Sequence, residues 1–172
     1  MKKLTFFCVL SFFIATTDGQ NKEDTNGNLI GLLNKSDFLQ GNHKRWFMTH
    51  YNEYEPEKKI INKIKKHLDG VSVKSFIGTW CHDSQRELPS FYKIMELADF
   101  DFEYNYEMIG ITRGKKTPDN LQQGFHINYT PTFIFYKDGA EIGRYVERAR
   151  QNFERDMLRI LRGKSYKHVY QN

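Results

Sequence analysis

Residues 80–84, Trp-Cys-His-Asp-Ser, combine a nucleophile with neighbours that affect its reactivity. A thiolate attacks disulfides readily, so Cys81 is the candidate reactive group of this run. Residues 71–79 are rich in β-branched and apolar side chains and predict a strand, whereas apolar residues recur at helical spacing after Cys81. The cysteine is therefore expected at the start of a helix, where free backbone N–H groups favour the thiolate over the neutral thiol.

The chain has only two cysteines, and the first, Cys8, lies in a segment that is expected to be removed. Residues 1–19 predict a signal peptide: a basic start is followed by an apolar stretch too short to span a bilayer and then by small residues. An uncleaved anchor is the alternative. The prediction implies an exported protein, periplasmic or secreted, with no membrane span after cleavage. Cys81 would then be the sole thiol, either buried and inert or kept for reaction.

Composition narrows the classes of function. The chain has 172 residues, of which 39% are hydrophobic and 15% aromatic, enough for one domain with a core. The net charge of +5 is modest and the lysines form no long basic run, so nucleic-acid binding is not expected. Because Cys81 and His82 are adjacent and no second pair has ligand spacing, neither a metal site nor another cofactor is expected.

The pattern divides the chain into four parts. Residues 1–19 are the signal peptide, 20–55 an N-terminal extension that is partly helical, 56–163 the main domain and 164–172 a polar tail. Of the extension, residues 20–35 are expected to be loosely ordered because they are polar and rich in Asn, Gly and Asp.

Strands and helices alternate in the main domain. Expected strands are residues 71–79, 104–112, 132–136 and 141–146, and expected helices begin at Pro56, after Cys81 and near Phe153. Residues 119–124 are expected to form a short helix or a turn, and Pro89 to interrupt the helix after Cys81. Asp138-Gly139 predicts a hairpin turn. This order predicts an α/β domain with its sheet covered on both faces.

Several of these segments resemble the thioredoxin family. The run around Cys81 is similar to the family's Trp-Cys-x-x-Cys element, and Pro89 matches the proline of its active-site helix. Residues 129–132 resemble the loop whose cis-proline faces the active-site cysteine, and 133–139 the strand and hairpin that follow. The resemblance covers about residues 58–162. It implies a thioredoxin-like α/β fold in which a central mixed β-sheet is flanked by helices on both faces.

The sequence also departs from the family at four positions. Ser84 replaces the second cysteine, and Asp83 stands where a proline is common. Ser75 falls where many thioredoxins bury an acid that helps to deprotonate the second cysteine, so the two losses fit together. Glu147 stands where a glycine near the substrate groove is usual. These departures argue against dithiol reductase activity.

The resemblance implies a one-cysteine form of disulfide exchange. Cys81 would attack a protein or small-thiol disulfide, and an external thiol reductant would resolve the mixed disulfide. Ser84 is expected to donate a hydrogen bond to the Cys81 thiolate. The expected substrate-binding residues are Trp80, His82, Asp83, Thr130 and Pro131.

Other interpretations stay open. The alternative for Cys81 is an inert buried residue, and for Trp80 it is packing over the sheet. The sequence favours a solvent-facing His82 without a catalytic role, and Asp83 and Ser84 also suit helix capping. For the whole chain, the alternatives are a non-catalytic peptide-binding or chaperone-like module and, third, a thiol peroxidase or metal-handling protein.

Overall fold

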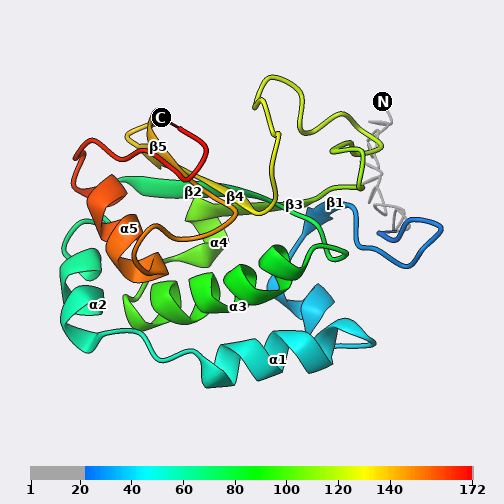
Figure 1. Cartoon of the computed structure of the whole chain (residues 1–172), viewed down its shortest axis with the longest axis horizontal. Helices are drawn as coiled ribbons and strands as arrows, with labels where there is room; N and C mark the ends of the chain where they lie inside the picture. The colour runs from blue at the N-terminus through cyan, green and yellow to red at the C-terminus, as the bar shows by residue number, and fades with distance from the viewer. Residues whose placement is uncertain (1–21, 172) are drawn as a thin grey trace, which may run out of the picture.

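The structure, a computed structural model, describes residues 22–171, so the signal peptide expected at residues 1–19 lies outside the described residues. It contains a five-stranded mixed sheet and five α-helices (Figure 1). The strands are β1 (Gly31–Leu33), β2 (Val71–Ile77), β3 (Tyr106–Gly110), β4 (Thr132–Lys137) and β5 (Ala140–Val146). The helices are the 3₁₀ turn η1 (Lys35–Phe38), α1 (His43–Glu53), α2 (Lys58–Lys65), α3 (His82–Leu97), α4 (Phe102–Asn105) and α5 (Phe153–Leu161).

The strand order is β1-β3-β2-β4-β5, which places β2 at the centre of the sheet. β2 pairs in parallel with β3, whereas the β1–β3, β2–β4 and β4–β5 pairs are antiparallel. The parallel pair needs a crossover connection, and α3 supplies it. Since Cys81 directly precedes α3, the central strand and the crossover helix together fix its position.

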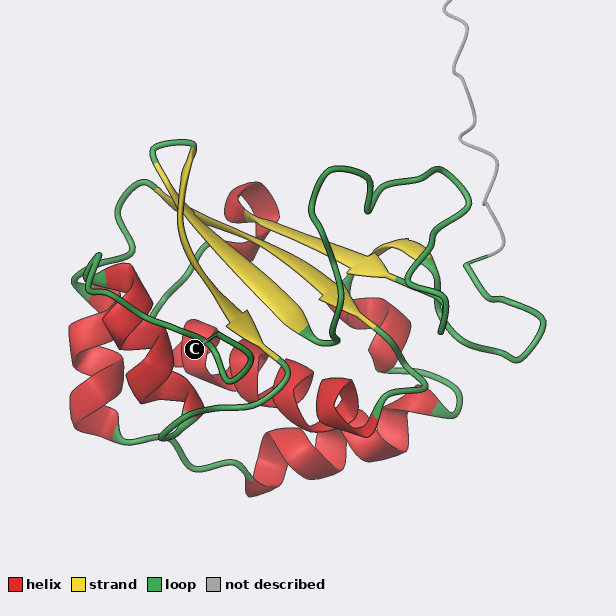
Figure 2. Ribbon diagram, turned by 45° about the horizontal axis from the view of Figure 1, so that its top comes forward, coloured by secondary structure: helices red, strands yellow, loops and turns green. Residues whose placement is uncertain are grey.

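All the helices that build the core pack on one face of the sheet (Figure 2). Buried side chains of α1, α2, α3 and α5 form a single cluster with Val71, Val73, Phe133 and Phe135 of the central strands. Alternate residues of the same strands point to the opposite face, as the strand period requires. There they form a second cluster that contains no side chain of a described helix: Phe76, Ile109, Ile111, Ile127 and Ile134, with Leu121, Phe125 and Tyr136 packed against it.

The expectation of helices on both faces is therefore wrong for the described residues. A loop, residues 112–131, covers the second face, and residues 119–124 form turns within it rather than a helix. Backbone conformation explains the difference, because Lys115, Asn120 and His126 adopt positive φ angles of 58°, 53° and 54°. A right-handed helix does not tolerate such residues, so the segment turns repeatedly.

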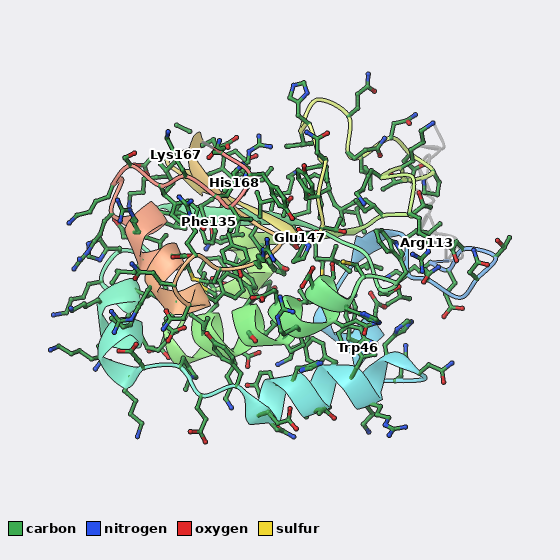
Figure 3. The ribbon with its side chains drawn as sticks, viewed as in Figure 1. Trp46, Arg113, Phe135, Glu147, Lys167 and His168 are labelled. Atoms are coloured by element: carbon green, nitrogen blue, oxygen red, sulfur yellow. The ribbon has the colours of Figure 1, made fainter. Side chains whose placement is uncertain are left out.

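Residues 22–55 share the sheet and core of the residues that follow. β1 pairs with β3, so the expectation that residues 20–35 are loosely ordered is wrong for Gly31–Leu33. α1 lies in the extension that was expected to be partly helical, and it packs along α3 (Figure 1). Trp46, which is labelled in Figure 3, lies with its ring centroid 5.7 Å from that of buried Phe38, as a core residue does.

Two further expectations have different outcomes. The hairpin is confirmed, since Asp138 and Gly139 join β4 to β5 with φ angles of 50° and 83°. Pro89, by contrast, does not interrupt α3, which runs unbroken from His82 to Leu97. The proline lacks one backbone donor, but Leu88 and Phe91 beside it are completely buried, and their packing holds the helix.

Candidate functional site

Cys81 occupies the N-cap position of α3, with extended backbone angles of φ −99° and ψ 121°. Its amide donates to the Gly78 carbonyl at 2.9 Å, and its own carbonyl accepts from the Gln85 amide at 3.0 Å. The thiol is partly exposed, and its Sγ lies 3.2 Å from the carbonyl oxygen of Thr130, to which it donates. The structure thus brings together the cysteine and the loop that the sequence analysis paired with it.

The Thr130–Pro131 peptide bond is cis, as the resemblance implied. Both side chains are buried, so this loop offers its backbone rather than its side chains to the site. The Pro131 carbonyl accepts from the amide of Glu147 at 2.7 Å. Glu147, labelled in Figure 3, adopts a φ of 62° that favours glycine, at the position where the family usually has one. Burial raises the pKa of its carboxyl group, with a further contribution from Asp83.

Ser84 stabilises the strand-to-helix junction. Its side chain is buried, and its hydroxyl oxygen accepts a hydrogen bond from the Gly78 amide at 3.1 Å. Among the described residues, no hydrogen bond joins Ser84 to the sulfur of Cys81, so the expected donation to the thiolate is not seen. Gly78 itself must be a glycine, because a Cβ there would lie 2.5 Å from Cε2 of Trp80.

The indole of Trp80, the residue before Cys81, has contacts on its nitrogen and on its ring face. Its indole Nε1 donates to the Ile111 carbonyl at 2.9 Å. The Arg113 guanidinium and the Lys115 ammonium lie 5.0 and 4.6 Å from its ring centroid, within cation–π range. Figure 3 shows Arg113 at the start of the loop that covers the second face. Sequence reasoning missed both cations, although the basic turn 113–116 was a visible signal.

The other two expected contact residues differ in environment. His82 is exposed. Asp83 forms an ion pair with Arg86 at 2.7 Å, and Arg86 also contacts Glu87 at 2.8 Å. The carboxylates of Asp83 and Glu87 therefore share the Arg86 guanidinium on the first turns of α3. Asp83 thus forms its ion pair within its own helix.

Glu87 is a buried acid that sequence reasoning did not single out. Ser75, where the family often buries an acid, is a buried serine whose hydroxyl lies 2.7 Å from that of Tyr106. Glu87 instead accepts a hydrogen bond from the buried Tyr145 hydroxyl at 2.8 Å. Burial raises the pKa of Glu87 despite the opposing charge of Arg86. The only signal in the sequence was a glutamate next to the apolar run of the helix.

Replacing Glu87 by Gln is expected to remove part of the pH dependence of stability. Because the folded-state pKa of Glu87 is raised, its stabilising contribution is present below its ordinary value of 4.5 and is lost as the pH rises through the raised value. Gln can still accept from Tyr145 but cannot ionise. The free energy of unfolding of Glu87→Gln relative to wild type is therefore expected to increase from about pH 4 to pH 7, measured by urea denaturation. A difference that stays constant over this range would contradict the assignment.

Two features are absent from residues 22–171. No group of three or more His, Cys, Asp or Glu side chains in this part of the chain is arranged to hold a metal ion. Within the same residues, no helix combines the length and apolar character needed to cross a membrane.

No family model and no curated protein matches the chain. Among solved structures, a protein of unknown function from Pseudomonas aeruginosa is 18% identical, covering 78% of this chain and 93% of its own, with a TM-score of 0.49. An HIV epitope scaffold is 18% identical over 70% of this chain and 82% of its own, with a TM-score of 0.48. Mitochondrial thioredoxin 3 of Saccharomyces cerevisiae in its oxidized form is 21% identical over 56% and 86%, with a TM-score of 0.33. These likenesses are weak, and the chain is described by its own structure as a mixed α/β fold with a five-stranded sheet and five helices.

Proposed function

We propose that this chain carries out thiol–disulfide exchange on a thioredoxin-like domain, with Cys81 as its single nucleophile. One observation carries the proposal: a partly exposed sulfur at the N-cap of α3 lies 3.2 Å from the Thr130 carbonyl oxygen. The free N–H groups of the first helical turn stabilise negative charge on such a sulfur. In this proposal the reaction takes place in the exported compartment, on protein or small-thiol disulfides.

The proposed reaction has two steps. Cys81 loses its proton to water, and the thiolate attacks one sulfur of a disulfide R–S–S–R′. The S–S bond breaks, R′–S⁻ leaves and takes up a proton, and Cys81 is joined to R–S in a mixed disulfide. An external thiolate then attacks the R sulfur, forms a new disulfide and releases the Cys81 thiolate. Disulfides are exchanged without net oxidation, so the chain needs no second cysteine.

The neighbours of the sulfur have distinct parts in this proposal. The Thr130 carbonyl accepts from the resting thiol, and it becomes free for an N–H of an extended substrate once the proton leaves. Trp80 gives an apolar surface beside the sulfur, and Arg113 and Lys115 add positive charge to it. Ser84 supports the turn through Gly78 and does not resolve the intermediate.

A second candidate function, peptide binding without chemistry, is favoured by one observation. The hydroxyl of Ser84 is bound to the Gly78 amide, so the junction is stable without a second thiol and without contact to the first. The loop at Thr130 would then bind extended peptides whether or not Cys81 reacts.

The exchange proposal is tested by trapping the mixed disulfide. The full chain carrying Cys8→Ser is incubated with a small-molecule disulfide, and the adduct is followed by mass spectrometry in native buffer and in urea. We expect Cys81 to form the adduct faster in the folded than in the unfolded chain, because the helix terminus acts only in the fold, and excess small thiol to release it. Slower adduct formation in the folded chain would refute exchange and leave the binding function.

A further inference from the structure

The C-terminal helix α5 separates its charges between two faces. Its acids, Glu154 and Asp156, are each only 3% exposed and face inward. Its solvent face carries Arg155 and Arg159, and Arg162 continues the row at the C-cap. These arginines are spaced i, i+4 and i+7 and therefore lie on one side of the helix. Because Glu154 and Asp156 face inward, no carboxylate of α5 lies between these arginines.

A hollow of about 660 Å³ lies against this row of arginines. Its walls come from four segments: Lys63 of α2, Arg150 before α5, the helix itself and the tail that includes Lys164. Figure 3 shows Lys167 of the tail passing over this side of the molecule. Seven of the thirteen residues that line the hollow are Lys or Arg, and one, Asp156, is acidic. Positive charge from distant parts of the chain thus converges on one concave site.

Contacts within the chain neutralise only part of this charge. Arg155 is paired with Glu57 at 2.7 Å, whereas Arg159 donates to the Ser165 carbonyl at 2.7 Å and so has a neutral partner. The ion pairs found within residues 22–171 do not include four of the other five cations: Lys63, Arg150, Arg162 and Lys164.

The sole acid of the hollow is already satisfied. Asp156 Oδ2 accepts from the Arg150 amide at 2.6 Å and from the Tyr166 hydroxyl at 3.2 Å. These two bonds also fasten the turn before α5 and the tail to the helix, and so they build the walls of the hollow. The Asp156 carboxylate therefore holds the walls together, and the cationic side chains line the hollow.

The dipole of the helix explains only some of these residues. Cations near a helix C-terminus are favoured by the helix dipole, which accounts for Arg159 and Arg162. Lys63 lies in the last turn of α2, where the dipole of that helix favours it, whereas Arg150 precedes the N-terminus of α5, where the dipole disfavours positive charge. Helix dipoles therefore do not account for Arg150, nor for the meeting of cations from separate segments at one hollow.

We propose that this hollow binds an anion that carries neighbouring phosphate groups, either a free small molecule or a lipid headgroup. Guanidinium groups bind phosphate oxygens in bidentate fashion, and Arg159 and Arg162, three residues apart, are separated by roughly 4.5 Å along the helix axis, which suits adjacent phosphates. The volume is in the range of small-molecule sites. The site shares no residue with the region around Cys81 and does not depend on the exchange reaction.

The test uses the full chain, with sodium tripolyphosphate as the free probe and vesicles containing phosphatidylinositol 4,5-bisphosphate as the lipid probe, so that both probes carry neighbouring phosphates. Calorimetry and vesicle co-sedimentation are carried out near physiological salt, where exposed single charges are largely screened. The variant Arg150→Gln/Arg162→Gln/Lys164→Gln is expected to weaken binding at least about tenfold, since it removes three charge-assisted contacts. A matched control removes the same charge from exposed cations elsewhere: Lys44→Gln/Arg45→Gln/Lys116→Gln.

Each outcome has one meaning. Binding of tripolyphosphate alone assigns the site to a free ligand, and vesicle binding assigns it to a headgroup, provided that the triple variant loses it and the control keeps it. Equal losses in the two variants would show a general charge effect and overturn the proposal. Failure of wild type to bind either probe would also overturn it. Urea denaturation of both variants checks that the fold is intact.

Discussion

Replacing Cys81 by Ser is expected to reduce disulfide exchange to the rate of the uncatalysed small-thiol reaction. A serine hydroxyl at the same N-cap position is not ionised at neutral pH and forms no mixed disulfide, so the first step is lost completely. Stability is expected to change little, because serine is also a favourable N-cap residue. The measurement is turnover of a mixed-disulfide substrate with excess small thiol, alongside urea denaturation of the same preparations.

Ser84→Ala is the matched control for this loss. The substitution leaves the buried Gly78 amide without its acceptor, which costs about 1–3 kcal/mol of stability. Exchange per folded molecule is nevertheless expected to persist, because the hydroxyl does not contact the sulfur. If Cys81→Ser retained exchange, the nucleophile would lie elsewhere. If Ser84→Ala abolished it in a folded protein, the serine would have a chemical role that its contacts do not reveal.

Phe91→Ala is expected to destabilise the protein by about 3–5 kcal/mol, a large part of the stability of an ordinary domain. Phe91 is completely buried on α3, and its ring centroid lies 4.7 Å from Phe133 and 5.2 Å from Tyr106. Removing it opens a cavity at the point where the crossover helix meets β4 and β3, in a shell that relaxes only partly. Urea denaturation monitored by circular dichroism measures the loss.

Tyr104→Ala provides the comparison for that loss. Tyr104 is 79% exposed, so its replacement is expected to change the free energy of unfolding by less than about 0.5 kcal/mol. A loss below about 1.5 kcal/mol for Phe91→Ala would mean that the aromatic cluster is not the packed centre of the fold.

Local sequence patterns predicted those strands and turns whose conformation depends mainly on their own residues. The strand β2 is rich in β-branched and apolar residues, and Asp138-Gly139 specifies a hairpin by backbone preference alone. β1 was missed because Gly31–Leu33 is short, and it becomes a strand only by pairing with β3. The cover of the second face was also missed, since it depends on scattered apolar residues in a turn-rich loop.

The same distinction applies to the site. The sequence placed Cys81 at a helix start, and the family resemblance paired it with Thr130. The cations over Trp80 and the bond between Glu87 and Tyr145 join segments far apart in the chain, so no local pattern predicted them. The sequence indicates the candidate nucleophile, the sulfur of Cys81. It does not indicate the environment that tertiary packing gives to that sulfur.

The loop over the second face of the sheet has both of its ends in the reactive region. Ile111, just before it, accepts the indole hydrogen bond of Trp80, and Thr130, near its end, accepts from the Cys81 thiol. Between these points, Phe125 and Ile127 cover Phe76 and its neighbours. In the proposed exchange reaction, a substrate that displaces either end would work against the packing of the whole segment. The selectivity of the proposed reaction would then depend on the integrity of this small core.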